Sequence, residues 1–173
     1  MFRMKRKLTK LSLLGEKIRV GIVGVGKMGH GLIHQMTRID GMEPALLIDE
    51  IPDKAIQSLL KTGISRDDIV VTNDISKAEA AINRNAYVVS EDYTIGYKLE
   101  KIDAMVDATG NPPFGAKMAY ESILNKKHVI MLNVECDAVV GPILNKYAHE
   151  NGVVYTGSAG DEPGAIMELA DFA

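Results

Sequence analysis

The sequence predicts an α/β fold, in which a doubly wound parallel sheet carries helices on both faces. Short apolar segments rich in β-branched residues alternate along the chain with segments of helical length and spacing. Such alternation is typical of parallel strands joined by helical crossovers. The length of 173 residues is that of one domain large enough to bury its own core. We therefore expect a single sheet and a single domain.

The first elements are the most clearly defined. The segment IRVGIVG, residues 18–24, has the composition of a buried strand, and residues 27–39 follow with apolar side chains at helical spacing. A second strand is expected over residues 42–49, where Pro44 indicates a late start or an edge position. A helix is then expected over residues 52–63, with a proline near its start and a glycine at its end.

The remainder of the chain continues this alternation. Further strands are expected over residues 68–74, 86–92, 102–110, 128–133 and 153–160. Further helices are expected over residues 75–84, 93–101, 112–127 and 140–152. The strand over residues 102–110 ends in small residues, and the helix after it begins with two prolines.

The two ends of the chain differ from this pattern. Residues 1–17 combine basic residues with a short apolar run, which predicts a helical arm rather than a targeting signal. The apolar helical pattern of Ile166, Leu169, Ala170 and Ala173 has no stop signal. We therefore expect residues 18–173 to be one domain of a longer protein, cut before a catalytic domain.

Composition and charge argue against several classes of protein. The net charge of −3 lacks the basic footprint of a nucleic-acid-binding protein. No apolar run approaches the ~20 residues that a membrane span needs. The single cysteine, Cys136, cannot form an internal disulfide, which favours a reducing cytoplasm.

A glycine motif lies between the first strand and the first helix of the domain. Gly24, Gly26 and Gly29, with Lys27 and Met28 between them, fit the pattern G-x-G-x-x-G. In this strand–turn–helix context, the first glycine permits the tight turn and the second lets a pyrophosphate approach the backbone. The third glycine permits close packing of helix on strand, and the helix start offers N–H groups to the anion. The motif predicts a dinucleotide site.

An acidic residue ends the second strand, 20 residues after Gly29. A carboxylate at Asp49 would accept hydrogen bonds from the adenosine ribose and repel a 2′-phosphate, which favours NAD over NADP. The alternative is a solvated aspartate at a strand end, but the spacing from the glycine motif favours the ribose contact. Lys54 and Arg38 could neutralise a phosphate, so NADP stays open.

Small residues follow the strand over residues 102–110. Ala108, Thr109 and Gly110 would leave room there for the ribose and nicotinamide at the carboxyl end of the sheet. Asn111 can equally cap the following helix, with Pro112 at its first position. Both roles are compatible.

Other reactive residues give weaker signals. His30 and His34 are spaced four apart on a helix, but no further ligand is placed beside them, so we expect no metal site. Cys136 has no evident activating base. Glu135, Asp137, Asp161 and Glu162 follow strands on the cofactor side and could orient a substrate or transfer protons, with Glu135 and Glu162 the catalytic candidates. Helix capping by these acidic residues is the alternative.

The chain resembles the N-terminal part of the homoserine-dehydrogenase-like oxidoreductases. The runs that carry the resemblance are RVGIVGVGKMG, VDATGNPPFGA, HVIMLNVECDAVVGPIL and GSAGDEPGAIMEL. They are most similar to the deoxyxylulose-phosphate-reductoisomerase-like branch, whose members carry a SAF domain. The resemblance implies a Rossmann NAD(P) domain and carbonyl reduction. Val134 stands where homoserine dehydrogenases have a lysine, and the acids of LLIDE replace a phosphate-binding arginine.

The leading hypothesis is the cofactor-binding part of an NAD(P)-dependent oxidoreductase acting on a small polar carbonyl or hydroxyl substrate. In it, Thr109, Gly110, Asn111 and Asn133 lie on the nicotinamide ribose side. The alternative is a non-catalytic NAD(H)-binding sensor or regulatory module. The sequence leaves both a monomer and a homo-oligomer open.

Overall fold

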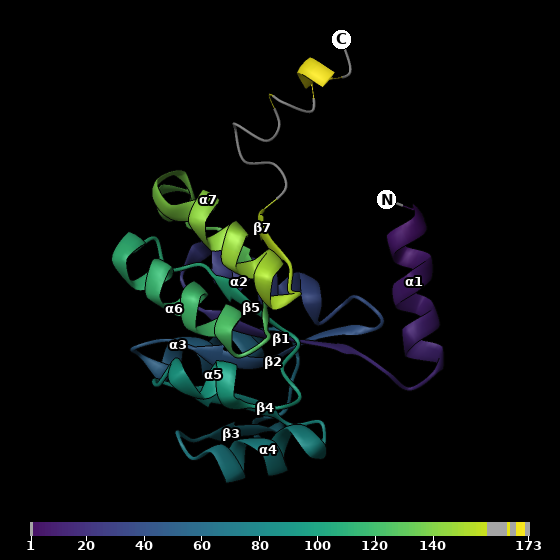
Figure 1. Cartoon of the computed structure of the whole chain (residues 1–173). Helices are drawn as coiled ribbons and strands as arrows, with labels where there is room; N and C mark the ends of the chain where they lie inside the picture. Colours follow the sequence, from purple (N-terminus) through teal and green to yellow (C-terminus); the bar gives the residue numbers. More distant parts are fainter. Residues whose placement is uncertain (1, 159–165, 167–168, 172–173) are drawn as a thin grey trace.

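A parallel sheet organises the chain, with its strands in the order β3-β4-β2-β1-β5-β6-β7 (Figure 1). The computed structural model describes residues 2–158, 166 and 169–171. Within that part of the chain the strands are β1 Ile18–Val23, β2 Met42–Ile48, β3 Ile69–Val71, β4 Tyr87–Ser90, β5 Ala104–Asp107, β6 His128–Met131 and β7 Tyr155–Gly157. The helices are α1 Phe2–Leu13, α2 Lys27–Met36, α3 Pro52–Lys61, α4 Ile75–Asn83, α5 Thr94–Lys98, α6 Pro112–Leu124 and α7 Val134–Asn151, with a 3₁₀ turn at Arg66–Asp68.

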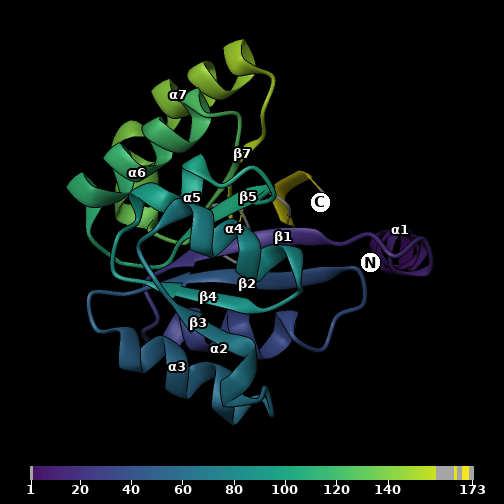
Figure 2. The ribbon, with the colours of Figure 1, turned by 90° about the horizontal axis from the view of Figure 1, so that it is seen from below.

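Helices cover both faces of the sheet, as the sequence predicts. Helices α2 and α3 lie on one face, whereas α4, α5, α6 and α7 lie on the other (Figure 2). Ile33 of α2 and Leu59 of α3 pack on the first face, and Ile82 of α4 and Met118 of α6 pack on the second. All four side chains are almost completely buried. The doubly wound fold class is therefore confirmed.

The direction of winding reverses beside β1. From β1 the chain moves through β2 toward β4 and β3, and then returns to add β5, β6 and β7 on the other side of β1. The loops after β1 and β5 consequently lead to opposite faces, although the two strands pair directly from Val20–Ala104 to Val23–Asp107. In open parallel sheets, ligands bind at this switch point, outside the carboxyl ends of the strands.

Pro44 occupies an irregular part of β2. The strand begins at Met42, so the predicted late start is wrong, but β4 pairs with β2 only from Leu46 onward. Pro44 therefore lies where β2 has a neighbour on one side only. The pairing with β1 shifts register there, because Arg19 faces Glu43 whereas Gly21 faces Leu46. A bulge tolerates the missing N–H of proline.

Helix α7 starts earlier than predicted. The sequence placed its start at residue 140, but the helix begins at Val134, directly after the cap residue Asn133. The Asn133 side chain accepts a hydrogen bond from the Cys136 N–H, and acidic residues follow in the first turn. Glu135 and Asp137 therefore occupy the helix-start positions that the sequence analysis gave as the alternative to a catalytic role.

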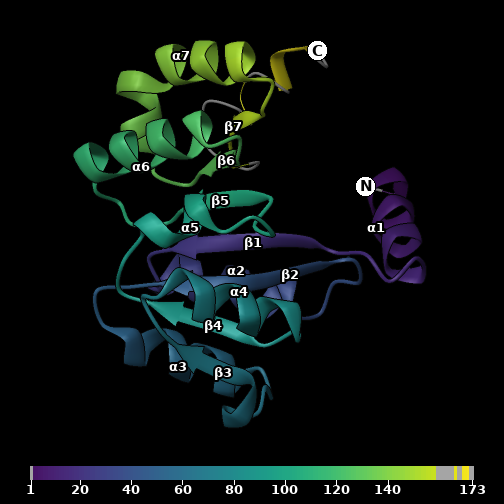
Figure 3. The ribbon, with the colours of Figure 1, turned by 60° about the horizontal axis from the view of Figure 1, so that its bottom comes forward.

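The helix predicted within residues 1–17 is observed as α1. It lies to the side of the sheet, before β1 and away from the carboxyl ends of the strands (Figure 3). Leu8 anchors it: the side chain is 7% exposed, and a Cβ at Gly41 would collide with the Leu8 carbonyl. Leu13, by contrast, is 83% exposed. Among the described residues, no helix is long and apolar enough to cross a membrane.

Candidate functional site

A cavity of about 540 Å³ opens at the switch point of the sheet. It lies at the carboxyl ends of β1, β2, β4 and β5. The residues that line it are Val23, Gly24, Gly26, Ile48, Asp49, Glu50, Lys54, Glu91, Tyr93, Ala108, Thr109, Asn111 and Phe114. Five of the residues predicted to bind a cofactor are therefore brought together: Gly24, Gly26, Asp49, Thr109 and Asn111.

The glycine loop has the geometry that its motif predicts. Gly24 turns with φ +89°, and a Cβ there would lie 2.8 Å from the Ala108 carbonyl oxygen. A Cβ at Gly29 would collide with the Gly24 carbonyl oxygen, so α2 can approach the loop only with glycine at this position. A Cβ at Gly26, however, would meet no atom within 4 Å. Gly26 thus borders open space, and the other two glycines serve close packing.

The start of α2 offers backbone donors to this space. Gly26 caps the helix without a side-chain hydrogen bond, and the first intrahelical bond runs from the His30 N–H to the Gly26 carbonyl. The N–H groups of Lys27, Met28 and Gly29 precede that bond and have no carbonyl within the helix. The Lys27 and Met28 side chains are exposed and do not line the cavity. Their contribution to an anion site would come from the backbone.

Asp49 lines the cavity but is already engaged by the protein. Its Oδ2 accepts a hydrogen bond from the Val25 N–H at 2.8 Å, and its Oδ1 accepts one from the Ile51 N–H at 3.0 Å. Lys54 Nζ lies 3.4 Å from Oδ1. The carboxylate therefore ties the glycine loop to the loop after β2. Glu50, the second acid of the LLIDE run, is exposed and lines the same cavity.

The loop after β5 also uses its polar side chains internally. Thr109 Oγ1 donates to Asp107 Oδ1 at 2.7 Å and accepts from the Asn111 N–H at 3.3 Å. Asn111 Oδ1 accepts from the Phe114 N–H and so caps α6. Gly110 adopts φ +64°. Thr109 and Asn111 line the cavity, whereas Gly110 between them does not.

The remaining predicted site residues lie elsewhere. Asn133 is 1% exposed and does not line the cavity; its Nδ2 donates to Asp107 Oδ2 at 3.0 Å. Glu135 is exposed in the first turn of α7, also outside the cavity lining. Glu162 and Asp161 lie outside the described residues.

Two aromatic side chains were missed by the sequence analysis. Tyr93, after β4, and Phe114, in α6, both line the cavity and pack edge to face with ring centroids 4.9 Å apart. Such a pair forms a rigid apolar wall suited to a planar ring. The available signal was an aromatic residue directly after a strand, in a chain with only 5% aromatic residues.

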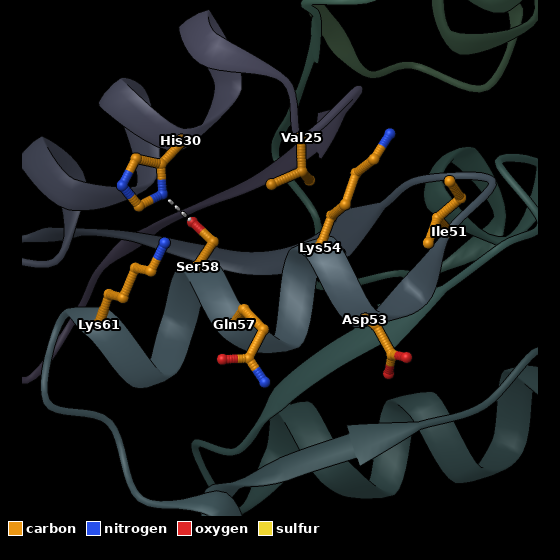
Figure 4. Close-up of a pocket in the computed structure, with 8 residues that line it drawn as sticks. All are labelled: Val25, His30, Ile51, Asp53, Lys54, Gln57, Ser58 and Lys61. Atoms are coloured by element: carbon orange, nitrogen blue, oxygen red, sulfur yellow. Dashed lines mark hydrogen bonds between the residues drawn. The ribbon is translucent and has the colours of Figure 1, made fainter.

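A second, shallower groove of about 380 Å³ lies between α2 and α3 (Figure 4). His30 Nδ1 and Ser58 Oγ are hydrogen-bonded across it at 2.7 Å, with Lys61 beside the pair and Lys54 further along α3, near Val25. Lys54 also lines the first cavity, so the two spaces share this cation. Arg38 follows α2 at the opposite, amino-terminal edge of the strands, where it contacts His34 at 3.4 Å. Of the two predicted phosphate-neutralising residues, only Lys54 adjoins the cavity.

Metal and thiol chemistry find no support in the described part of the chain. No group of three or more His, Cys, Asp or Glu side chains there could hold a metal ion. Cys136 is 1% exposed, and burial, followed by the nearby Asp107 and Asp137, raises the pKa of its thiol. A buried thiol with a raised pKa stays protonated and is a poor nucleophile.

The fold is that of the Rossmann-type nucleotide-binding domains. Solved structures with the same fold include the WlbA dehydrogenase from Bordetella pertussis in complex with NADH and UDP-GlcNAcA, at 20% identity and a TM-score of 0.61 over 91% of this chain. A 3-ketoreductase from Actinomadura kijaniata, in complex with TDP-benzene and NADP, aligns at 13% identity and a TM-score of 0.62 over 91% of this chain. An NAD-binding protein from Listeria innocua aligns at 20% identity and a TM-score of 0.53 over 82%.

The present chain is shorter than these proteins. The matched regions cover 42%, 43% and 35% of the three solved chains, respectively. No protein-family model and no curated protein matches the sequence. At these identities the likeness establishes the fold.

Proposed function

We propose that the chain is the NAD(P)-binding domain of an oxidoreductase. The observation that carries the proposal is the cavity at the switch point, where a helix start without a side-chain cap, open space at Gly26 and carboxylates at the end of β2 meet. The backbone N–H groups at the start of α2 bind the pyrophosphate. Nicotinamide supplies hydride transfer, while the protein binds and orients it.

The adenosine half lies on the β2 and β4 side of the cavity. Asp49 and Glu50 there can accept hydrogen bonds from ribose hydroxyls, and Tyr93 offers a face to the adenine ring. Because Asp49 already accepts two backbone hydrogen bonds, the exposed Glu50 shares the ribose contact. The nicotinamide half then lies toward β5, along the backbone of Thr109–Asn111.

The acidic end of β2 favours NAD over NADP, since a 2′-phosphate would meet two carboxylates. Lys54, 3.4 Å from Asp49, offsets this repulsion and permits weaker binding of NADP. The three solved structures described above are, by their descriptions, bound to NADH, bound to NADP, or NAD-binding. They support NAD(P) as the ligand class and leave the choice between the two coenzymes to this chain's own residues.

The reaction class is an oxidation or reduction of a small polar carbonyl or hydroxyl substrate. Two of the solved structures with this fold are a dehydrogenase and a ketoreductase, which supports an oxidoreductase of general type. The homoserine-dehydrogenase-like resemblance rests on the sequence runs alone. Glu135 and Glu162 remain its substrate-side candidates. Since the chain spans less than half of the solved proteins, we expect it to bind cofactor without turnover.

Isothermal calorimetry with NAD⁺, NADH and NADP⁺ tests the proposal. We expect NAD⁺ and NADH to bind more tightly than NADP⁺. At a ligand concentration of about 100 Kd, binding would stabilise the fold by about 2.7 kcal/mol. That corresponds to a rise in Tm of roughly 5–10 °C for a domain of this size. Absence of binding by all three coenzymes would overturn the proposal.

A non-catalytic NAD(H) sensor remains the second candidate. A sensor would bind the same coenzymes as an enzyme, so coenzyme binding does not distinguish the two. The discriminating measurement is hydride transfer by a longer protein that contains this chain. Turnover with any carbonyl substrate excludes the sensor, and binding with a large change in conformation but no turnover favours it.

A further inference from the structure

Asp107, the last residue of β5, has a fully buried carboxylate, with 0% of the residue exposed. Its Oδ1 accepts hydrogen bonds from the Thr109 N–H at 2.9 Å and from Thr109 Oγ1 at 2.7 Å. Its Oδ2 accepts one from Asn133 Nδ2 at 3.0 Å. All three donors are neutral. The carboxylate lies between the loop that lines the cavity and the first turn of α7.

A carboxylate in this position is not needed to form a turn. Burying an anion whose partners are all neutral is costly, and a neutral side chain could close the same turn. Two acceptor oxygens are needed, however, to hold two segments at once, and hydrogen bonds to a charged acceptor are stronger than those to a neutral one. The burial therefore indicates a requirement for fixed geometry between the two loops.

Helix α6 packs directly against this carboxylate. A Cβ at Gly115 would collide with Asp107 Oδ2 and lie 2.8 Å from Asn133 Nδ2. Glycine at position 115 thus lets α6 cover the carboxylate from the side. Three elements, β5, α6 and α7, converge on one charged group.

The loop that Asp107 holds borders only part of the cavity. Thr109 and Asn111 line the β5 side, whereas Asp49, Glu50 and Tyr93 line the side of β2 and β4. With a pyrophosphate at the start of α2, between these sides, the two halves of a dinucleotide fall on opposite sides. A displacement of the Thr109 loop would therefore affect one half of the ligand.

We propose that Asp107 is a positioning residue for the nicotinamide half of the cofactor. The inference rests on the proposed function. Asp107 does not touch the cavity; it acts through Thr109, whose backbone and hydroxyl it holds, and through Asn133, which caps α7. It fixes the wall against which the nicotinamide ribose packs and leaves the adenosine side unaffected.

The test compares NAD⁺ with ADP, which carries only the adenosine half and the diphosphate. Asp107→Asn keeps the side-chain volume but replaces one acceptor oxygen by an NH₂ group facing a donor. We expect the affinity for NAD⁺ to fall about tenfold or more, as for loss of a hydrogen bond to a charged group. The affinity for ADP should change by less than about twofold, because the substitution leaves the adenosine-side residues Asp49, Glu50 and Tyr93 unchanged.

Asp103→Asn is the matched control. Asp103 lies just before β5, at the opposite end of the strand from Asp107, and its Oδ2 accepts a hydrogen bond from the Arg19 N–H at 2.7 Å. The control changes an equally charged side chain bonded to backbone but far from the cavity. It should alter neither affinity.

Two variants of Thr109 keep the test open if Asp107→Asn fails to fold. Thr109→Val removes the hydroxyl bond to Asp107 and should weaken NAD⁺ binding selectively. Thr109→Ser keeps the hydroxyl and should restore it. An equal loss of NAD⁺ and ADP affinity in Asp107→Asn or Thr109→Val, or no loss of either, would overturn the inference. If the wild-type chain binds neither ligand, the proposed function itself fails.

Discussion

At the scale of single residues, the glycine motif divides into packing and binding positions. Gly24 and Gly29 are required by contacts within the protein, whereas Gly26 faces open space. The sequence motif alone gives all three glycines equal weight. The structure separates them because it shows which glycines lie against other protein atoms and which one faces open space that a ligand could fill.

Substitution of these glycines should therefore have opposite effects on stability and binding. Gly26→Ala has an ordinary φ of −79° and should cost less than about 1 kcal/mol of folding free energy, but its methyl group enters the pyrophosphate space. We expect the affinity for NAD⁺ to fall at least about tenfold. Gly29→Ala should instead destabilise the fold by about 1–3 kcal/mol through overpacking.

Urea unfolding and calorimetry on the same samples check this separation. Gly31→Ala serves as the control, since its Cβ would also meet open space but within the exposed part of α2. It should stabilise the helix by about 0.5–1 kcal/mol and leave binding unchanged. Unchanged binding in Gly26→Ala would place the pyrophosphate elsewhere.

Lys54 is the residue that we expect to determine how well the chain tolerates NADP. Its ammonium group neutralises part of the charge of Asp49 and borders both cavities. Lys54→Ala should weaken NADP⁺ binding by about five- to tenfold more than NAD⁺ binding, because a 2′-phosphate loses its nearest cation. Calorimetric titration of both coenzymes measures the ratio. The same loss for both would show that Lys54 acts on the loop and not on the phosphate.

At the scale of elements, the alternation of strands and helices could be predicted from periodicity and turn residues. The strand over residues 18–24 and the helix from Pro112 were located to within a few residues, because β-branched runs and prolines mark them directly. The start of α7 was placed too late, although its cap is local: Asn133 Oδ1 accepts a hydrogen bond from the Cys136 N–H. The bond from Asn133 Nδ2 to Asp107, by contrast, joins distant segments and leaves no local pattern.

The same limit applies to the candidate site. The motif residues Gly24, Gly26 and Asp49 were found by spacing, and they do lie together. Spacing could not reveal that the Thr109 and Asn133 side chains donate hydrogen bonds to Asp107. Nor could it reveal that Tyr93 and Phe114 pack together in the cavity wall. Glu162 lies outside the described residues, so its role stays a prediction.

We expect the link between α7 and β7 to weaken at alkaline pH. Tyr155 donates a hydrogen bond to Asp137 Oδ1 at 2.7 Å, and burial, together with this bond, raises the pKa of its phenol well above the usual value. An unfolded tyrosine ionises near pH 10. Because the folded pKa is the higher one, the stabilisation is fully present below about pH 10 and is lost as the pH rises further.

The prediction is a smaller alkaline loss of stability in Tyr155→Phe. In urea unfolding at pH 8, the variant should be about 1 kcal/mol less stable than wild type. At pH 10.5, the difference in free energy of unfolding between the two proteins should be smaller. Taking the difference between the two proteins cancels the opposite contribution of Lys127, whose pKa burial lowers. Tyr120→Phe, at a 38% exposed position, is the control. A gap that is constant with pH would contradict the prediction.

At the scale of the whole molecule, charged residues are unevenly distributed along the chain. Helix α1 carries five of the 20 Lys and Arg residues and no Asp or Glu, so the rest of the chain has 15 basic against 23 acidic residues. The basic helix lies to the side of the sheet and leads into the start of β1 (Figure 1). The net charge of −3 therefore conceals two regions of opposite sign.

This separation has a practical consequence for purification. A protein with a sequence pI near 5.8 should not bind a cation-exchange resin at pH 7. The exposed lysines of α1 nevertheless present a local cationic surface, and adsorption to a resin depends on such surfaces more than on the net charge. We expect retention at low salt and elution within a few hundred millimolar NaCl. If a Lys5→Glu/Lys10→Glu variant is no longer retained, then α1 is the surface that binds the resin. The protein could in that case be purified through this helix without an added tag.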